Sequence, residues 1–280
     1  MRIGFIGPGR MGRPMVDRLV AAGHDVTVYA RRPGAAAALA ADRLNVAASV
    51  PETVDGADAV FVVVLTDQEL RSVCLGPDGA VAAMAPGAAL VQHTTCDPAT
   101  VVSIAEAGAA RRVAVLDAAL SGGPHDIQDG RLTLWVGADD DTAWDRMLPL
   151  METYASPILR VGAPGDGQRV KLVNNALFVA QVGLAVDAAR LAASLGVTEE
   201  VILAALQHGS GASRALSVVA RGGSVAAVAD RLADLMAKDV AVVREVADRA
   251  GADLGVIGAV LASEAVEERV LGKVPGTRNR

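Results

Sequence analysis

The chain has 280 residues, of which 52% are hydrophobic and 21% are charged, and its formal net charge is −6. This length allows one large domain or two ordinary ones, and the negative charge argues against nucleic acid as a partner, because phosphate backbones need a basic surface. Cys74 and Cys96 form no C-x-x-C pair, and the chain begins with a strand pattern rather than a basic-apolar leader, so we expect reduced thiols and a cytoplasmic protein.

The first predicted elements are a strand at residues 2–6, a glycine-rich turn and an amphipathic helix. The turn consists of Gly7, Pro8, Gly9, Arg10, Met11 and Gly12. Strand, G-x-G-x-x-G and helix follow in the order that a dinucleotide-binding βαβ unit requires. The first glycine allows the tight turn, the second lets the backbone approach a pyrophosphate, and the third lets helix and strand pack closely. We therefore expect this turn to bind a dinucleotide, with an ordinary tight turn as the alternative.

The second predicted strand, at residues 25–30, ends in two arginines. NAD-binding domains usually carry Asp or Glu about 20 residues beyond the glycines, where it accepts a hydrogen bond from the ribose 2′-hydroxyl. This chain has Arg31 and Arg32 there instead. Guanidinium groups bind phosphate through a planar fork of donors. The sequence therefore favours NADP and leaves NAD as the alternative cofactor, unless both arginines are solvated loop residues.

Strand and helix patterns keep alternating as far as residue 154. Residues 59–65 are a continuous apolar run, which fits a central parallel strand buried on both faces. Thr66 and Asp67 follow at its carboxyl end, the edge where open α/β sheets bind ligands. The alternation predicts an α/β fold with a doubly wound sheet. Further strands are expected at residues 44–48, 88–92, 112–116 and 132–136, and helices at residues 34–41, 51–56, 100–109 and 141–154.

From residue 165 the pattern changes to helices only. We expect a linker at residues 162–167 and one long helix at residues 168–195, and hence a dinucleotide-binding domain over 1–163 and an all-helical domain over 164–280. The long helix is apolar on most faces, and its uncharged run is shorter than the ~18 residues of a membrane span. We therefore expect no membrane span and a homodimer or homotetramer packed through this helix. Other helices are expected at residues 199–208, 225–238, 239–249 and 256–271.

One polar group stands out on the long helix. Lys171, Asn174 and Asn175 have the i, i+3, i+4 spacing that places side chains on one side of a helix. Burying them costs free energy unless they find partners, so they either face water beside the linker or belong to a site. Lysine changes its pKa readily when desolvated, which suits a proton donor or acceptor near neutral pH. The nucleotide-binding pattern that precedes the helix favours a catalytic role for Lys171.

Four segments together resemble the β-hydroxyacid dehydrogenase family, which includes 3-hydroxyisobutyrate dehydrogenases. Residues 5–15 resemble its cofactor signature, down to Met-Gly-x-x-Met. Residues 117–123, Asp-Ala-Ala-Leu-Ser-Gly-Gly, resemble its substrate-binding Asp-Ala-Pro-Val-Ser-Gly-Gly. Residues 171–175 resemble its catalytic Lys-x-x-Asn-Asn, and Lys238-Asp239 resembles a Lys-Asp pair late in its helical domain. The resemblance covers nearly the whole chain, and four motifs in order are more specific than any one of them.

The resemblance implies a Rossmann domain followed by an all-α domain, and transfer of a hydride between NADP(H) or NAD(H) and a small β-hydroxy acid or its semialdehyde. The family's general acid/base corresponds to Lys171. Its substrate-binding residues, which hold the substrate carboxylate or hydrogen-bond the substrate, correspond to Ser121, Gly122, Gly123 and Asn175. Its cofactor contacts outside the turn correspond to Leu65, Thr66, Thr95 and Lys238, with Asp239 supporting Lys238.

The chain departs from the family pattern at several positions. The usual Asp-x-Ser-Thr is replaced by residues 92–95, Gln-His-Thr-Thr, and a proline of the substrate motif by Ala119. His125, Asp126 and Arg131 also depart from the pattern, and they either change the substrate pocket or lie in a solvated loop. The sequence therefore identifies the reaction better than the substrate. None of the four histidines has metal-ligand spacing, and we expect no metal.

The sequence also allows two other functions. The first is an imine reductase on the same scaffold, and the presence of Lys171 counts against it because such relatives usually lack the lysine. The second is a nucleotide-binding protein without catalysis, and the intact Ser121, Lys171 and Asn175 count against that.

Overall fold

The computed structural model describes residues 1–31 and 44–272. Contacts within the chain divide it into two compact units, Met1–Lys171 and Leu172–Arg280, which we call unit 1 and unit 2. The division into domains at residues 163 and 164 stays a prediction. The helix expected at residues 34–41 lies outside the described residues.

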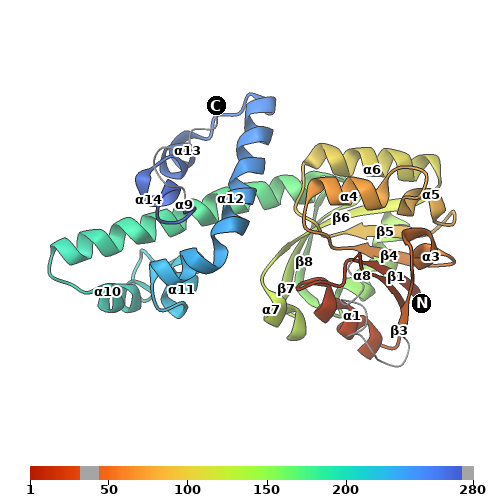
Figure 1. The fold of residues 1–280 in the computed structure, drawn as a ribbon, viewed down its shortest axis with the longest axis horizontal. Coiled ribbons are helices and arrows are strands. Elements are labelled where there is room, and N and C mark those ends of the chain that lie inside the picture. The colour runs from red at the N-terminus through yellow and green to blue at the C-terminus, as the bar shows by residue number, and fades with distance from the viewer. Residues whose placement is uncertain (32–43, 273–280) are drawn as a thin grey trace. The chain divides into compact units, whose positions relative to one another are not determined.

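Unit 1 is built on one eight-stranded sheet with the order β3-β2-β1-β4-β5-β6-β7-β8 (Figure 1). Strands β1 to β6 run parallel, β7 pairs antiparallel with β6, and β8 pairs parallel with β7. The strand order reverses on either side of β1, as in a doubly wound sheet, so the predicted fold class is confirmed. The strands are β1 (Arg2–Ile6), β2 (Asp25–Tyr29), β3 (Leu44–Val46), β4 (Ala59–Val62), β5 (Ala89–Gln92), β6 (Ala114–Ser121), β7 (Leu132–Gly137) and β8 (Ala155–Gly162).

Helices cover both faces of the sheet because successive side chains of each strand point to opposite faces. Phe5 of β1 belongs to a core with Leu19 of α1 and Met147 of α8, whereas Ile6 belongs to a second core with Leu70 of α4. Side chains of Ser49, Thr66, Asp97 and Asp140 cap the starts of α3, α4, α6 and α8. The helices of unit 1 are α1 (Gly12–Ala21), α3 (Val50–Val54), α4 (Asp67–Cys74), α5 (Ala80–Ala83), α6 (Pro98–Ala110), α7 (Pro124–Gln128) and α8 (Asp141–Met151).

Two strands end three or more residues away from the predicted end. β4 ends at Val62 rather than at Leu65, because residues 63–65 leave the sheet and pass over the glycine-rich turn, where Leu65 is 66% exposed. β6 continues through Ser121 rather than ending at residue 116, because the antiparallel strand β7 pairs with its second half. The residues of the predicted substrate motif therefore start inside a strand.

Unit 2 is all-helical, as predicted, and its core lies between α9 and α12, with Val179 and Val182 from the first and Val240 and Val243 from the second (Figure 1). Helix α9 starts at Asp166 in unit 1 and continues into unit 2, so the linker after β8 is only residues 163–165. The helices are α9 (Asp166–Ser194), α10 (Glu199–Leu206), α11 (Arg214–Arg221), α12 (Val225–Ala250), α13 (Gly255–Leu261) and α14 (Glu264–Glu267).

Two predictions for unit 2 were wrong in detail, and one helix was missed. The helices expected at residues 225–238 and 239–249 are one helix, α12, because no glycine or proline interrupts this segment. The helix expected at residues 256–271 is broken into α13 and α14, since the chain turns at Ala262 and Ser263. Helix α11 was not predicted, although Ser213 is an N-cap residue whose side chain accepts a hydrogen bond from the Leu216 amide.

Candidate active site

The glycine-rich turn after β1 opens into a cavity of about 510 Å³. Gly7 has φ of 93°, and a Cβ there would collide with the Val63 carbonyl oxygen, so the position requires glycine. A Cβ at Gly12 would collide with the Gly7 carbonyl oxygen, whereas the space beside Gly9 is open. The cavity is lined by all six turn residues, by Tyr29, Ala30 and Arg31, by residues 63–65 after β4, and by residues of α3 and α4.

The start of α1 fits a phosphate group. No side chain caps this helix, and its first turn has no acidic residue. The N-terminal N–H groups of a helix that lack a partner bind anions readily, and the helix dipole adds to this. Together with the open space beside Gly9, this end of the cavity fits the pyrophosphate of a dinucleotide.

The other end of the cavity carries Arg31, which lies just after β2. Its Nη1 lies 2.7 Å from Oε1 of Glu69 on α4, and this ion pair was not predicted. Glu69 follows Thr66 by three residues, and this spacing is the sequence signal from which the polar contacts at the start of α4 could have been predicted. Arg32, the second predicted arginine, lies outside the described residues.

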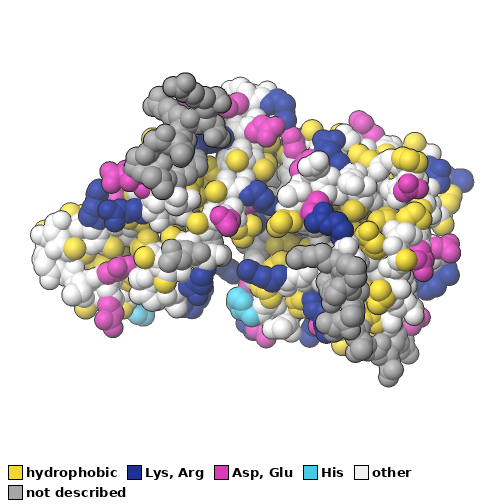
Figure 2. Space-filling view, viewed as in Figure 1, with side chains coloured by type: hydrophobic (Ala, Val, Ile, Leu, Met, Phe, Trp, Pro, Cys, Tyr) yellow, Lys and Arg dark blue, Asp and Glu magenta, His cyan; other side chains and the backbone are white. Residues whose placement is uncertain are grey.

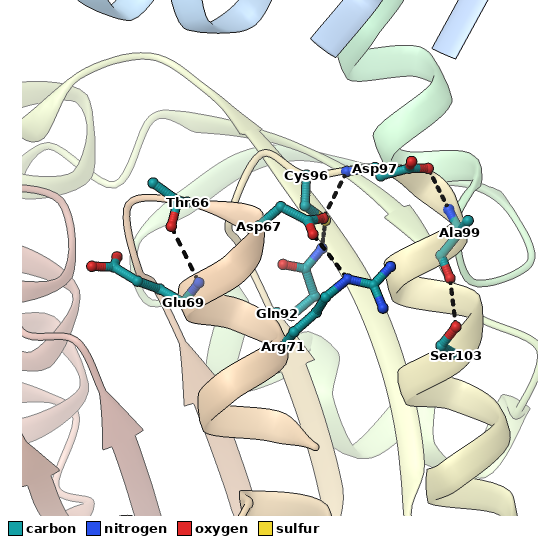
Figure 3. A network of polar contacts seen from close by, with 9 residues as sticks. All are labelled: Thr66, Asp67, Glu69, Arg71, Gln92, Cys96, Asp97, Ala99 and Ser103. Atoms are coloured by element: carbon teal, nitrogen blue, oxygen red, sulfur yellow. Dashed lines mark hydrogen bonds and ion pairs between the residues drawn. The ribbon is translucent and has the colours of Figure 1, made fainter. Parts of the chain in front are cut away.

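The remaining predicted cofactor contacts of unit 1 follow β4 and β5. Leu65 lines the cavity. The Thr66 hydroxyl accepts a hydrogen bond from the Glu69 amide at 3.1 Å, so it caps α4 (Figure 3). Thr95 is half-buried after β5, and its neighbour Thr94 accepts a hydrogen bond from the Val64 amide at 3.0 Å. This bond ties the two loops together at the carboxyl edge of the sheet.

The predicted substrate loop begins at Ser121, the last residue of β6. Gly122 has φ of 135°, which favours glycine. The Gly123 amide donates a hydrogen bond to Oδ2 of Asp126 at 2.7 Å, and His125 Nε2 lies 3.5 Å from the other oxygen of the same carboxylate. Asp126 therefore supports the loop by binding one of the amides that the family resemblance assigns to the substrate.

Asp117, on β6, is fully buried and holds the start of α9. Its Oδ2 accepts hydrogen bonds from the backbone amides of Gly165 at 3.1 Å and Gln168 at 2.9 Å. Its Oδ1 accepts from the side-chain amides of Gln168 at 2.7 Å and Gln92 at 2.8 Å. Burial raises the pKa of Asp117, and these four hydrogen bonds act in the opposite direction because they favour the carboxylate.

Two further contacts bring α9 close to the sheet. The Gln168 side-chain oxygen accepts a hydrogen bond from the Cys96 amide at 3.0 Å, which joins α9 to the end of β5. At Gly167, a Cβ would lie 2.6 Å from the carbonyl oxygens of Asp117 and Trp135, so only glycine allows this approach. Lys171 follows one turn later on the same side of the helix. The roles of Asp117 and Gln168 were not predicted, since they depend on residues about 50 positions apart.

The polar group on α9 continues into unit 2. The Asn174 amide donates to Oδ1 of Asn175 at 3.2 Å, and the Asn175 amide donates to Oδ2 of Asp239 on α12 at 2.8 Å. Lys238 Nζ lies 3.6 Å from Oδ1 of Asp239. The structure therefore brings together Asn175, Lys238 and Asp239, which belong to two separate motifs of the sequence.

His93 stands at the variable position of the usual Asp-x-Ser-Thr motif and is a core residue. One ring nitrogen lies 2.6 Å from the Ala118 carbonyl oxygen and the other 3.0 Å from the Tyr154 hydroxyl. Burial lowers the pKa of His93 to about 4, so the ring is neutral at pH 7. Among the described residues, no group of three or more His, Cys, Asp or Glu side chains is placed to hold a metal ion.

Two family descriptions match the chain. The NAD binding domain of 6-phosphogluconate dehydrogenase matches residues 2–162, and the NAD-binding domain of NADP-dependent 3-hydroxyisobutyrate dehydrogenase matches residues 165–270. The matches therefore extend over both units.

Individual relatives agree with these matches. An NAD-dependent L-serine dehydrogenase of Pseudomonas aeruginosa is 34% identical over 255 residues, which are 88% of this chain and 85% of that protein. A 3-hydroxyisobutyrate dehydrogenase of the same organism is 32% identical over 216 residues, 77% and 72% of the two chains. A solved structure of Mycobacterium tuberculosis 3-hydroxyisobutyrate dehydrogenase with L-serine has a TM-score of 0.82 at 27% identity, covering 92% of this chain and 90% of that one.

Proposed function

The chain belongs to the β-hydroxyacid dehydrogenase family, and from this premise we propose that it transfers a hydride between a nicotinamide cofactor and a small β-hydroxy acid or the corresponding semialdehyde. One observation carries the proposal. The start of the helix that bears Lys171 is held by Asp117 and Gln168 at the edge of the sheet where β5 ends beside Asp117 of β6. The glycine-rich turn follows β1, which is parallel to both strands, so it opens at the same edge.

The protein's part in the reaction is to orient the reactants and to move one proton. The nicotinamide, when bound, supplies or accepts the hydride. Lys171 is the general acid/base, which gives a proton to the carbonyl oxygen of the semialdehyde or takes one from the hydroxyl group of the acid. The substrate carboxylate is held by the Ser121 hydroxyl and the Gly122 backbone amide, and by the Gly123 amide in exchange for its hydrogen bond to Asp126. Asn175 hydrogen-bonds the substrate.

For the cofactor we propose NADP as the preferred form, with NAD as the alternative. The end of β2 carries Arg31 at the rim of the cavity and has no carboxylate to accept a hydrogen bond from a ribose hydroxyl. Arg31 and Arg32 are proposed to bind the 2′-phosphate, and Lys238 to contact the cofactor. For the substrate, the names of the relatives, L-serine dehydrogenase and 3-hydroxyisobutyrate dehydrogenase, support a small β-hydroxy carboxylate.

We also propose that the chain forms a homodimer or homotetramer through α9. Four large hydrophobic side chains are exposed along this helix with spacings of four and seven residues, which place them on one stripe: Val173, Leu177, Leu184 and Leu191. Exposed Leu195, the residue after the helix, continues the spacing. On the view of unit 2 in Figure 2, hydrophobic side chains likewise reach the surface between charged ones. Among the described helices, only α9 is long and apolar enough to cross a membrane by length and composition, a test that core helices also pass.

The replacement of Lys171 by alanine tests the reaction. With reduced-nicotinamide absorbance as the signal, we expect the wild type to turn over small β-hydroxy acids or semialdehydes, and Lys171→Ala to be slower by about 10²–10⁴-fold, because the acid/base is lost. Arg169→Ala is the matched control, since it removes a positive charge from an exposed position two residues earlier on the same helix.

The outcomes separate the candidate functions. Full turnover by Lys171→Ala, with a cofactor dissociation constant equal to that of the wild type, would contradict the acid/base role. Turnover of a cyclic imine with none of any hydroxy acid would favour the imine reductase. Tight cofactor binding without turnover of any substrate class would favour a non-catalytic nucleotide-binding protein.

A further inference from the structure

The wall of the cofactor cavity carries a carboxylate next to the arginine that is proposed to bind a 2′-phosphate. Glu69 and Arg31 both line this cavity, and Glu69 Oε1 lies 2.7 Å from Arg31 Nη1. The Arg31 side chain is 73% exposed, whereas that of Glu69 is 24% exposed. The arginine is therefore the more solvent-exposed partner, and the carboxylate is the more buried one.

The backbone around Glu69 explains why its carboxylate is fixed. Oε2 accepts a hydrogen bond from the Leu65 amide at 2.9 Å, while the Glu69 amide donates to the Thr66 hydroxyl at 3.1 Å. The two bonds hold the start of α4 as a capping box would, except that the carboxylate accepts from the residue before the N-cap; the helix dipole also favours a negative charge there. Figure 3 shows the Glu69 side chain pointing away from Asp67 and Arg71, which pair with each other on the same helix. Glu69 therefore has one oxygen committed to the backbone and one to Arg31.

This arrangement distinguishes between the two forms of the cofactor. A phosphate group at Arg31 must share the guanidinium with Glu69 and lie close to a fixed negative charge, which repels it. A ribose hydroxyl has no charge and can donate a hydrogen bond to a carboxylate. The position after β2 that usually provides this carboxylate is occupied by an arginine here. Glu69 is the acidic residue that lines the cavity beside Arg31.

We propose that Glu69 determines the balance between NADP and NAD: it weakens the binding of the 2′-phosphate by holding Arg31, and it supplies the carboxylate for a ribose hydroxyl. This proposal rests on the proposed function for the class of cofactor. It predicts that the natural chain discriminates less between NADP and NAD than its arginines alone would indicate.

Glu69→Gln tests this role, because glutamine keeps the size and an oxygen for the Leu65 amide but has no charge. The dissociation constants of NADPH and NADH are measured by calorimetry on the purified chain, without any substrate. We expect NADPH to bind about fivefold to tenfold more tightly, since an exposed ion pair no longer competes for Arg31 and a like charge is gone. NADH should bind equally or more weakly.

Two controls make the measurement specific. Asp67→Asn removes the same charge from the same helix, but Asp67 Oδ2 bonds to Arg71 Nε at 3.0 Å and Asp67 does not line the cavity, so the cofactor preference should stay unchanged. In the Arg31→Ala background, Glu69→Gln should lose most of its effect on NADPH, because the competition for the guanidinium no longer exists.

The possible results are distinct. If Glu69→Gln changes the affinities for NADPH and NADH equally, or if Asp67→Asn changes the preference as much, the role of Glu69 is overturned while the cofactor class stands. If the wild type binds neither dinucleotide, the proposed function itself fails, and the role of Glu69 with it.

Discussion

Replacing Asp117 should lower the free energy of unfolding, and the loss should be larger when the substitute can accept fewer of its hydrogen bonds. The carboxylate accepts four bonds, from the amides of Gly165 and Gln168 and from the side chains of Gln168 and Gln92, and it is fully buried. Alanine leaves all four donors buried without this acceptor, and each such donor costs about 1–3 kcal/mol. The loss of about 4 kcal/mol or more compares with a typical total stability of about 5–15 kcal/mol.

Asparagine should cost much less, because its oxygen can accept from the two backbone amides while its NH₂ faces the two glutamines. Gln92 Oε1 has no hydrogen-bond partner among the described residues, so a rotated Gln92 amide can accept from this NH₂. Gln168 cannot rotate in the same way, because its oxygen already accepts from the Cys96 amide. One donor–donor conflict remains, at about 1–3 kcal/mol, and the removal of a buried carboxylate offsets part of it.

The assay is urea unfolding at pH 7 of the wild type, Asp117→Asn and Asp117→Ala. Asp129→Asn serves as the control, since Asp129 pairs with Arg131 at the surface. We expect the free energy of unfolding to decrease in the order wild type, Asp117→Asn, Asp117→Ala. We also expect Asp117→Asn to have a lower kcat and an unchanged cofactor dissociation constant, because the start of α9 carries Lys171. Equal losses for asparagine and alanine, or stability within 0.5 kcal/mol of the wild type for both, would refute the hydrogen-bond reasoning.

Two other predictions concern pH and assembly. Burial lowers the pKa of His93 from 6.5 to about 4. Between these two pH values the unfolded chain binds more protons than the folded chain. The free energy of unfolding should therefore fall by about 3 kcal/mol as the pH drops from 6.5 to 4. Unfolding curves at several pH values should show this component in the wild type and not in His93→Phe; equal slopes would contradict it. Leu184→Asp and Leu191→Asp should reduce the mass measured by light scattering to that of a monomer. Val256→Asp, at an exposed site on α13, should leave this mass unchanged. A monomeric wild type would contradict assembly through the hydrophobic stripe of α9.

The elements that could be predicted from the sequence are those that local rules determine. Few other structures fit the sequence patterns of the glycine-rich turn, of the apolar strands β1 and β5 and of the long helix α9. β8 lacks such a pattern, because it is an edge strand with mostly exposed residues and owes its conformation to pairing with β7. Helices α5 and α7 have only four and five residues, too few for a period to show.

The motifs of the site could be predicted from the sequence one by one. The contacts that join these motifs could not be predicted. Asn175 and Lys238 came from motifs more than 60 residues apart, and their connection through Asp239 exists only in the folded unit. Glu69 is a different case, because its spacing from Thr66 already indicated a capping box. Its pairing with Arg31 could not be foreseen, since it requires β2 and β4 to lie on either side of β1.

The direction in which Lys171 projects depends on a contact that helix periodicity alone does not supply. The i, i+3, i+4 spacing places Lys171 and Asn175 on one side of α9, but it does not say which side faces the sheet. Gly167 identifies the side of α9 that faces the sheet, because its Cα lies close to the carbonyl oxygens of Asp117 and Trp135. Lys171 is four residues further, about 40° around the helix from Gly167 at 3.6 residues per turn. Gly167 and Asp117 therefore determine the orientation of the lysine for which the family motif gives only the position.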